Sequence, residues 1–266
     1  MLLDLDGTLA PIVERPQDVQ IPDEIRRLLP VLSARYGLVA FISGREITEL
    51  QRIVGLEAAA YSGNHGVEIR LRDGRGLPVP EAQPGTKPLR EFAARWAPDV
   101  LGGWGVWLED KGATLTFHYR TAPDPDLAAA RLREHVAPAA VAEGLLAEPG
   151  RMSLEVHPGG PVNKGTAFRA LLDEHPKVRR AVSLGDDRTD VTIWREFRKL
   201  VDAGRLDTAI AIGVRSDETP PEVLEEADIL VDGVYGSMTV LSHLAGDDVG
   251  QLDPSRPAWG RGHYVD

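Results

Sequence analysis

Two carboxylates stand two residues apart near the start of the chain, in Asp4-Leu-Asp-Gly-Thr-Leu9. The residues before them are apolar and favour a strand, and residues i and i+2 of a strand point to the same face. We therefore expect Asp4 and Asp6 to present their carboxylates together, which is costly without a nearby cation. An acidic turn is the alternative interpretation, because Asp-Gly is common where strands end.

A second acidic cluster, Gly185-Asp-Asp-Arg-Thr-Asp190, follows the apolar run 181–184 and opens a helical pattern. In open parallel sheets, ligands bind at the carboxyl ends of the strands. Two acidic clusters that meet at this edge would offer only oxygen ligands, and we expect them to hold octahedral Mg²⁺. Taken alone, the second cluster could instead be an N-capping turn, because Asp favours helix starts.

Two further segments have residues that could hold phosphate oxygens. Phe41-Ile-Ser-Gly-Arg45 ends a strand-like run before a helical one, which offers the Ser43 hydroxyl and backbone N–H groups. Asn163-Lys-Gly165 places Lys164 at a predicted helix start, where a cation is unfavourable unless an anion lies nearby. Neither signal is specific by itself. Ser-Gly turns are common in proteins, and Lys164 could be an isolated surface lysine.

Apolar runs that alternate with amphipathic runs would position these residues. The expected strands are 2–5, 38–42, 181–184, 208–212 and 229–231, and the expected helices are 23–35, 46–54, 164–172, 188–201 and 237–244. This alternation indicates an α/β core, a parallel sheet covered by helices. Pro30 should kink or split the first helix.

The segment 73–161 follows a different pattern and predicts an α+β unit inserted into a core formed by 1–72 and 162–245. Its expected helices are 89–96 and 126–143, and its expected strands are 104–109, 113–120 and 152–157. Thr116, His118 and Arg120 would share one strand face, which is either solvated or in contact with a ligand. We expect the polar segment 246–266 to be a loosely held tail.

Composition excludes several classes of protein. The 266 residues carry a net charge of −11, which opposes attraction to nucleic acid or to an anionic membrane surface. No stretch approaches the roughly 20 apolar residues of a membrane span. The absence of cysteine excludes disulfides, thiolate metal sites and cysteine nucleophiles. Because Met1 leads directly into the first apolar run, we expect no signal or transit peptide and a cytoplasmic location.

The chain contains, in order, the first acidic cluster, the Ser43 segment, the Lys164 segment and the second acidic cluster. In this order the four motifs resemble the haloacid dehalogenase (HAD) superfamily, which has a Rossmann-like core. More narrowly, the chain resembles the trehalose-6-phosphate phosphatase family over residues 2 to about 245. The additional residues that carry this resemblance are Gly63-Asn-His-Gly-Val-Glu68, Lys111, His118-Tyr-Arg120 and Glu155-Val-His-Pro158.

The resemblance implies a role for each motif. Asp4 would attack phosphorus to form an aspartyl-phosphate, and Asp6 would protonate the leaving sugar oxygen and later activate water. Mg²⁺ would be held by Asp4, the backbone carbonyl of Asp6 and Asp186, with Asp187 and Asp190 as ligands or supports. The phosphoryl oxygens would contact Ser43 and Lys164, and the insert would be a cap that closes over the sugar. Substrate contacts are implied for Arg45, Asn64, His65, Glu109, Lys111, His118, Arg120 and Glu155.

The expected substrate is trehalose 6-phosphate, and the expected protein is a monomer with a small-molecule substrate. A trehalose-6-phosphate synthase is a candidate partner. Alternatives are a phosphatase for sucrose 6-phosphate, mannosyl-3-phosphoglycerate or glucosylglycerol phosphate, and a non-catalytic domain that binds a sugar phosphate. The chain departs from the family pattern at Val191-Thr-Ile-Trp194, which replaces acids and an aromatic residue, and at His157, a position that is often basic.

Overall fold

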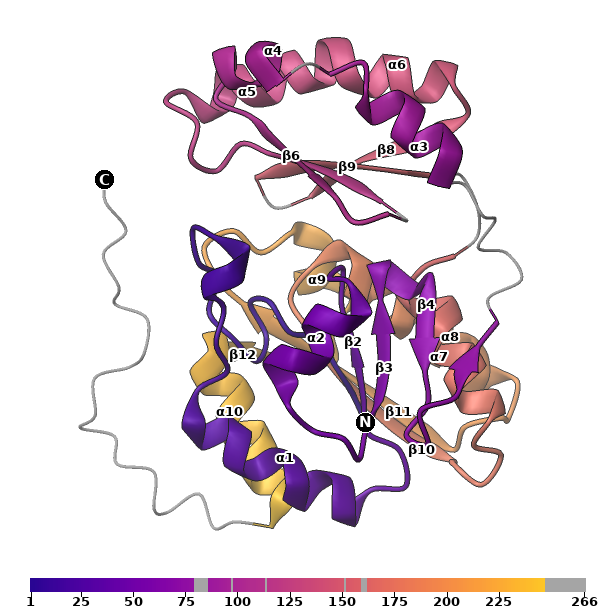
Figure 1. The fold of residues 1–266 in the computed structure, drawn as a ribbon. Coiled ribbons are helices and arrows are strands. Elements are labelled where there is room, and N and C mark those ends of the chain that lie inside the picture. Colours follow the sequence, from indigo (N-terminus) through magenta and orange to yellow (C-terminus); the bar gives the residue numbers. More distant parts are fainter. Residues whose placement is uncertain (79–85, 97, 113, 151, 159–161, 247–266) are drawn as a thin grey trace, which may run out of the picture. The chain divides into compact units, whose positions relative to one another are not determined.

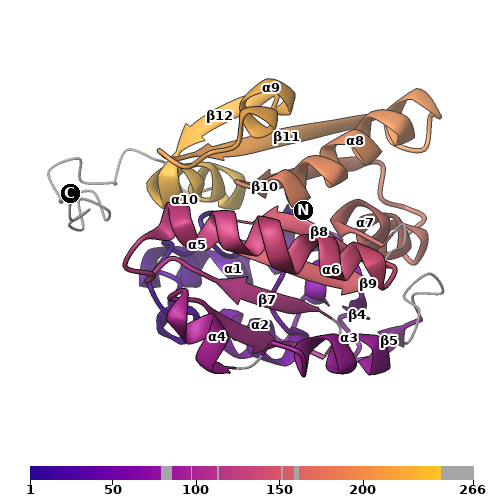
Figure 2. The ribbon, with the colours of Figure 1, turned by 90° about the horizontal axis from the view of Figure 1, so that it is seen from above.

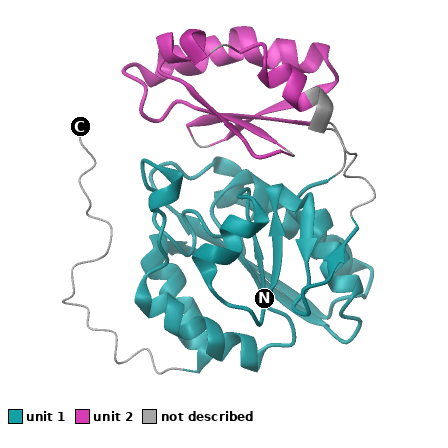
Figure 3. Cartoon of the chain, in the orientation of Figure 1, with its two compact units in different colours: residues 1–78, 162–266 teal, residues 79–161 magenta. Residues whose placement is uncertain are grey.

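The computed structural model describes residues 1–78, 86–96, 98–112, 114–150, 152–158 and 162–246. The chain divides into two compact units, a core unit (Met1–Pro78 with Val162–Asp266) and an inserted unit (Val79–Pro161), shown in Figure 3. The expected boundary between 72 and 73 is therefore shifted, because β5 (Gly76–Leu77) pairs with β4 (Glu68–Arg70) in the core sheet. Beyond Gly246, the expected tail lies outside the described residues.

The described part of the core unit holds one eight-stranded sheet in the order β12-β11-β10-β1-β2-β3-β4-β5. The strands from β12 to β3 are parallel, and only β4 and β5 are antiparallel to their neighbours. The bounds of the six parallel strands are β1 (Leu2–Leu3), β2 (Ala40–Ile42), β3 (Ala60–Gly63), β10 (Arg180–Gly185), β11 (Thr208–Arg215) and β12 (Ile229–Asp232). The five expected strands are confirmed, although β1 ends at Leu3 and not at Leu5, whereas β3, β4 and β5 were not expected.

Two sets of helices bury the apolar residues of this sheet (Figures 1 and 2). The first set, α1 (Asp23–Arg35), α2 (Ile47–Val54) and α10 (Gly233–Ala245), shares one apolar core with Leu3 and Phe41 of the strands. In the second set, α7 (Lys164–Asp173) packs against α8 (Arg188–Asp202), which also contacts β10, β11 and the short helix α9 (Pro221–Glu226). The expected helices are confirmed, but α1 is not split, since it continues through Pro30.

The inserted unit has its own antiparallel sheet, in the order β6-β7-β9-β8. Its strands are β6 (Trp107–Asp110), β7 (Leu115–His118), β8 (Leu145–Gly150) and β9 (Ser153–Pro158). The helices α3 (Thr86–Ala93), α4 (Pro98–Gly103), α5 (Pro125–Arg131) and α6 (Ala137–Ala142) lie together along one side of this sheet (Figure 1). The helix expected at 126–143 is confirmed as α5, a π-helical turn (Leu132–Val136) and α6. The elements β8 and α4 were not expected.

Three short loops of the core unit follow the carboxyl ends of neighbouring parallel strands. The chain leaves β1 before Asp4, β2 before Ser43 and β10 before Asp186. Because β10, β1 and β2 are adjacent and parallel, these loops meet at one edge of the sheet. This edge positions the polar residues described next.

Candidate active site

A buried acidic group lies at the carboxyl edge of the core sheet. Asp4, Asp186 and Asp190 each offer a carboxylate oxygen within 4.8 Å of the others, and all three residues are buried. The ammonium group of Lys164 donates hydrogen bonds to Oδ1 of Asp4 at 2.7 Å and to Oδ1 of Asp190 at 2.8 Å. The structure therefore brings together four of the predicted site residues from three separate parts of the chain.

The second acidic cluster is divided by the start of α8. Asp187 is the N-cap residue of this helix, and Oδ2 of Asp190 accepts the backbone N–H groups of Asp186 and Asp187, both at 3.2 Å. Thr8 donates a hydrogen bond to Oδ1 of Asp186 at 3.3 Å. Asp186 and Asp190 thus belong to the acidic group, and the helix-capping interpretation describes Asp187, which lies outside that group.

The surroundings of Asp4 favour its neutral form when no metal is bound. Burial raises the pKa of Asp4 to about 7, and the nearby Asp190 carboxylate adds to the increase, while Lys164 opposes it. Burial also lowers the pKa of the Lys164 ammonium, but the charges of Asp190 and Asp4 outweigh this effect and raise it above its usual range. Lys164 is therefore a permanent cation beside two buried carboxyl groups.

Asp6 is held by a different cation. Arg45 donates from Nε to Oδ2 of Asp6 and from Nη2 to Oδ1 of Asp6, both at 2.8 Å, which is a bidentate pair. The strand β1 ends at Leu3, and Gly7 has a φ of 82°, so Asp6 lies in a turn and not in a continuing strand. The strand-based reason for expecting Asp4 and Asp6 on one face therefore does not apply, and Asp6 lies outside the acidic group. The two carboxylates are nevertheless near enough for the charge of Asp6 to contribute to the raised pKa of Asp4.

The turn after β2 and the turn after β3 are joined by backbone hydrogen bonds. Asn64 donates its N–H to the carbonyl of Arg45 at 2.8 Å, and His65 donates to the carbonyl of Ser43 at 3.1 Å. Ser43 is buried, and its Oγ accepts the N–H of Arg45 at 3.2 Å. These bonds bring together three predicted site residues, Ser43 from the turn after β2 and Asn64 and His65 from the turn after β3.

Asn64 and His65 occupy an unusual backbone conformation. Both lie in the 3-10 turn Asn64–Gly66, with φ values of 47° and 54°, a left-handed region that side-chain-bearing residues rarely adopt. Asn64 is 1% exposed, yet neither polar atom of its side chain has a hydrogen-bond partner among the described residues. Buried polar groups without partners and strained backbones concentrate at functional sites. These observations support Asn64 as a ligand-binding residue.

Lys164 is fixed by the start of α7. Asn163 caps this helix through a capping box with Thr166, and the N–H of Gly165 donates to Oγ1 of Thr192 at 3.0 Å. Thr192 itself donates to the carbonyl of Thr189 in α8 at 2.6 Å, so the bond from Gly165 to Thr192 ties the start of α7 to α8. Thr192 was not predicted as a site residue. The only sequence feature that could have indicated Thr192 was its place in Val191-Thr-Ile-Trp194, where the chain departs from the family pattern.

In the inserted unit, the predicted residues lie along adjacent strands. The pairing of β6, β7, β9 and β8 aligns Glu109, Thr116, Glu155 and Glu148 in one row across the sheet. Oε2 of Glu109 lies 2.9 Å from Nε2 of His118 and 3.6 Å from Nζ of Lys111. Trp107 stacks on His118 with ring centroids 4.1 Å apart. The row therefore forms a polar face, and Arg120 follows the end of β7.

The donor set of the acidic group suits a hard divalent cation. Carboxylate oxygens are the ligands that Mg²⁺ and Ca²⁺ prefer, and no softer ligand is present among Asp4, Asp186 and Asp190. Lys164 occupies one oxygen of Asp4 and one of Asp190, and the N-terminal turn of α8 occupies the other oxygen of Asp190. Asp4 and Asp186 are thus the carboxylates best placed to hold a metal.

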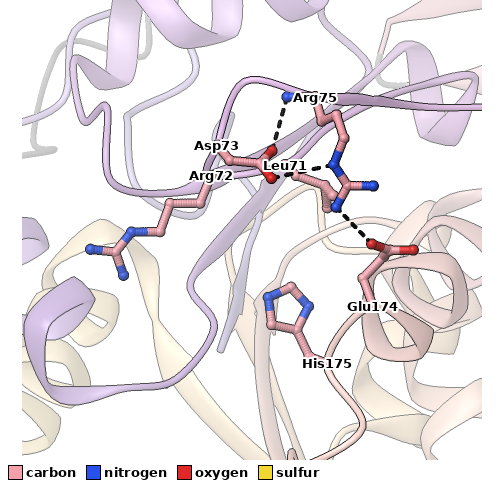
Figure 4. Close-up of a pocket in the computed structure, with 6 residues that line it drawn as sticks. All are labelled: Leu71, Arg72, Asp73, Arg75, Glu174 and His175. Carbon is pink, nitrogen blue, oxygen red and sulfur yellow. Dashed lines mark hydrogen bonds and ion pairs between the residues drawn. The ribbon is translucent and has the colours of Figure 1, made fainter.

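A separate pocket of about 500 Å³ lies elsewhere in the core unit (Figure 4). It is lined by Leu71, Arg72, Asp73, Arg75, Glu174 and His175. Arg75 is paired with Asp73 at 3.3 Å and with Glu174 at 2.9 Å. Because β4 runs antiparallel to β3, and Glu174 follows the end of α7, the pocket lies at the edge opposite the acidic group. It contains none of the predicted site residues.

No helix in the described residues is long and apolar enough to cross a membrane.

Comparison with known proteins identifies the family of this chain. The family model described as Trehalose-phosphatase matches residues 2–228. The chain is 34% identical over 203 residues to the "Probable trehalose-phosphate phosphatase" of Sinorhizobium fredii, with 75% of this chain and 74% of that protein covered. It is 34% identical over 191 residues to the "Trehalose-6-phosphate phosphatase" of Escherichia coli, with 70% and 69% covered.

Solved structures show the same fold. The C-terminal domain of the Candida albicans trehalose-6-phosphate phosphatase aligns with a TM-score of 0.77 at 24% identity, over 93% of this chain and 91% of that one. A haloacid dehalogenase-like hydrolase from Bacteroides thetaiotaomicron aligns with a TM-score of 0.62 at 14% identity, over 91% and 98%. The expected HAD-like fold is therefore confirmed, and the family match and the curated relatives show that the chain belongs to the trehalose-phosphatase family.

Proposed function

We propose that this protein is a Mg²⁺-dependent phosphatase that converts trehalose 6-phosphate to trehalose and phosphate through an aspartyl-phosphate. The observation that carries the proposal is the buried group of Asp4, Asp186 and Asp190 around Lys164, in a chain of the trehalose-phosphatase family. Several relatives are named for this substrate.

In the first step, a carboxylate oxygen of Asp4 attacks phosphorus and the bond from phosphorus to the sugar oxygen breaks. Asp6, in its acid form, gives its proton to that oxygen, so that a neutral sugar leaves. In the second step, Asp6 takes a proton from water, the water oxygen bonds to phosphorus, and Asp4 is released as a carboxylate. The transition state is dominated by charge on the phosphoryl oxygens, for which Lys164 and Ser43 are suitable partners.

Asp4, Asp186 and the backbone carbonyl of Asp6 would hold Mg²⁺, which neutralises charge on the phosphoryl group when bound. Asp190 lies in the acidic group but already accepts hydrogen bonds from Lys164 and from two backbone N–H groups. We therefore assign Asp190 chiefly to positioning Lys164, and Asp187 to capping α8.

For the sugar, we propose contacts from Asn64 and His65 in the core unit and from the polar face of the inserted unit. Glu109, Lys111, His118 and Glu155 supply the donors and acceptors that a disaccharide with many hydroxyl groups requires. Arg120 is the fifth proposed contact from the inserted unit. A cytoplasmic location, a monomeric state and a synthase partner remain proposals that rest on the resemblance and on the composition.

The test is phosphate release with Mg²⁺ from trehalose 6-phosphate, sucrose 6-phosphate, mannosyl-3-phosphoglycerate and glucose 6-phosphate. We expect kcat/KM for trehalose 6-phosphate to exceed the others by orders of magnitude, and the Asp4→Asn variant to lose at least about a thousandfold in kcat while keeping its fold. Equal hydrolysis of all four substrates would overturn the substrate assignment. Full activity of Asp4→Asn would overturn the mechanism.

A further inference from the structure

The side chain of Arg45 is surrounded by hydrogen-bond acceptors inside the core unit. Besides the two bonds to Asp6, its Nη1 donates to the backbone carbonyl of Pro16 at 2.9 Å and to Oε1 of Glu49 at 2.7 Å. The Arg45 side chain is only 8% exposed. A buried guanidinium with fixed acceptors on both sides has little freedom to move, so it holds whatever it binds in a defined place.

Each acceptor comes from a different part of the core unit. Asp6 lies in the turn after β1, Pro16 begins the 3-10 turn Pro16–Asp18, and Glu49 lies in the first turn of α2. Glu49 and Arg45 are four residues apart, the spacing at which side chains along a helix meet. The Glu49 side chain is 26% exposed, so its contact with Arg45 is only partly screened by water.

We propose that Glu49 is a positioning residue for the reaction, and that it acts by holding Arg45 against Asp6. Within the proposed function, on which this inference rests, Asp6 first gives a proton to the leaving oxygen and then takes one from water. Both transfers require the carboxyl group to stay within hydrogen-bond reach of the reacting oxygen, so its placement controls the rate. Arg45 fixes both oxygens of that carboxyl group, and Glu49 fixes Arg45.

This assignment changes the interpretation of Arg45. The resemblance implies a substrate contact, but four hydrogen bonds of the side chain are already directed at Asp6, Pro16 and Glu49. In this structure, the Arg45 side chain therefore binds Asp6, the residue proposed to transfer protons. The Arg45 backbone makes two further hydrogen bonds, one to Ser43 and one with Asn64.

The test exploits the dependence of the reaction on a proton donor. Departure of a sugar alkoxide needs protonation, whereas 4-nitrophenolate leaves without it. We expect Glu49→Ala to lower kcat for trehalose 6-phosphate by about tenfold or more, with KM unchanged, because misplacement of a general acid forfeits part of its contribution. With 4-nitrophenyl phosphate, kcat/KM reports only the steps up to departure of the leaving group, and it should change by less than about threefold. Glu49→Gln keeps the acceptor for Nη1 and should restore most of the activity.

A matched control is Glu46→Ala. Glu46 is the exposed residue just before the same helix, and its carboxylate accepts a hydrogen bond from Thr48 at 2.7 Å. The acceptors of the Arg45 side chain are instead Asp6, Pro16 and Glu49. It should behave as the wild type with both substrates. Arg45→Lys loses the bidentate geometry and should show the same selective loss as Glu49→Ala, more strongly. Thermal unfolding of each variant confirms that the protein measured is folded.

Two results would overturn the inference. Equal losses in kcat/KM with both substrates would mean that Glu49 supports the fold or the phosphoryl site. No loss with either substrate would mean that Glu49 has no part in the reaction. Failure of the proposed function is distinguishable, because the wild type would then not hydrolyse trehalose 6-phosphate. The comparison of a poor and a good leaving group could still be made with any alkyl phosphate that the wild type accepts.

Discussion

Lys164 donates a hydrogen bond from its ammonium group to Oδ1 of Asp4 at 2.7 Å, although the two residues are 160 positions apart in the sequence. The same group binds Asp190, so one cation is shared by two buried carboxyl groups. A lysine at the first position of a helix faces the positive end of the helix dipole, which is unfavourable. Asp4 and Asp190 offset this cost, and together the three residues link β1, α7 and α8.

Removal of Lys164 should destabilise the protein in the absence of metal. Lys164→Met leaves Asp4 and Asp190 buried without their cation, and breaking a buried ion pair by removing one partner costs about 3 to 5 kcal/mol. We expect the free energy of unfolding in urea with EDTA to fall by about that amount. The turnover of trehalose 6-phosphate should fall at least about a hundredfold, because charge on the phosphoryl oxygens loses a partner.

The control is Lys199→Met, because Lys199 is 70% exposed and its ion pair among the described residues is with Glu196 at 3.3 Å. Exposed pairs contribute about 0 to 1 kcal/mol, so this variant should unfold almost as the wild type does. If Lys164→Met were as stable as Lys199→Met in EDTA, the buried pairs would not contribute as described.

Binding of Mg²⁺ should become tighter as the pH rises from 5.5 to 7.5. Without metal, burial raises the pKa of Asp4 from its usual value near 4 to about 7, so the neutral form stabilises the fold at low pH and this contribution is lost as the pH rises through 7. A ligand for Mg²⁺ must be ionised, and metal binding below pH 7 must therefore displace a proton. We expect the apparent affinity to rise by about tenfold or more over this range.

Calorimetric titration of Mg²⁺ in buffers with different ionisation enthalpies measures both the affinity and the proton released. Asp4→Asn has no carboxyl group at this position and is the control, since its weaker binding should depend little on pH. Affinity that is flat between pH 5.5 and 7.5 in the wild type would contradict the prediction.

The strands and helices of the core could be predicted because the chain marks them with local signals. Pro22 and Gly37 bracket an apolar stripe, and the helix α1 occupies Asp23–Arg35 as expected. The run before Gly63 contains only Ala, Tyr and Ser, which lack the branched apolar side chains of a typical buried strand. Its place in the sheet depends on pairing with β2 and on its buried faces, and neither is visible in a short segment.

The residues of the site could be identified from motifs, but their mutual contacts could not. The spacing of Asp4 and Asp6 predicts two carboxylates on one face only if the strand continues, and here the strand ends at Leu3. The pairing of Asp6 with Arg45 joins residues 39 positions apart, and the pairing of Arg45 with Glu49 has the spacing of many unimportant surface pairs. Burial distinguishes Arg45 from the other arginines that the structure describes.

The close approach of Gly185 to Asp190 predicts that no larger residue is tolerated at the end of β10. A Cβ atom on Gly185 would overlap Cγ and Cβ of Asp190. Asp190 is 0% exposed and bonded to Lys164 and to two backbone N–H groups, so it has no room to yield. We expect Gly185→Ala to lower the free energy of unfolding by about 1 to 3 kcal/mol and to reduce phosphate release sharply.

Gly37→Ala is the matched control, because a Cβ atom there would have no other atom within 4 Å. Its stability and its rate of phosphate release should equal those of the wild type. Wild-type activity in Gly185→Ala would show that Asp190 can shift without consequence, and would remove the argument that it positions Lys164.

Glu109 should control the affinity for the sugar without affecting the chemical step. Its carboxylate accepts from His118 at 2.9 Å, and His118 is in turn held by stacking on Trp107. A residue that binds the non-reacting part of a substrate contributes equally to the ground state and the transition state, so its loss raises KM and leaves kcat unchanged. We therefore expect Glu109→Gln to raise KM for trehalose 6-phosphate about tenfold, and to leave hydrolysis of 4-nitrophenyl phosphate unaltered.

The control is Glu134→Gln, at a 74% exposed side chain of the same unit, which should leave KM and kcat unchanged with both substrates. A fall in kcat for both substrates in Glu109→Gln would instead indicate that the polar face supports the reacting groups, and the proposed role in sugar recognition would be abandoned.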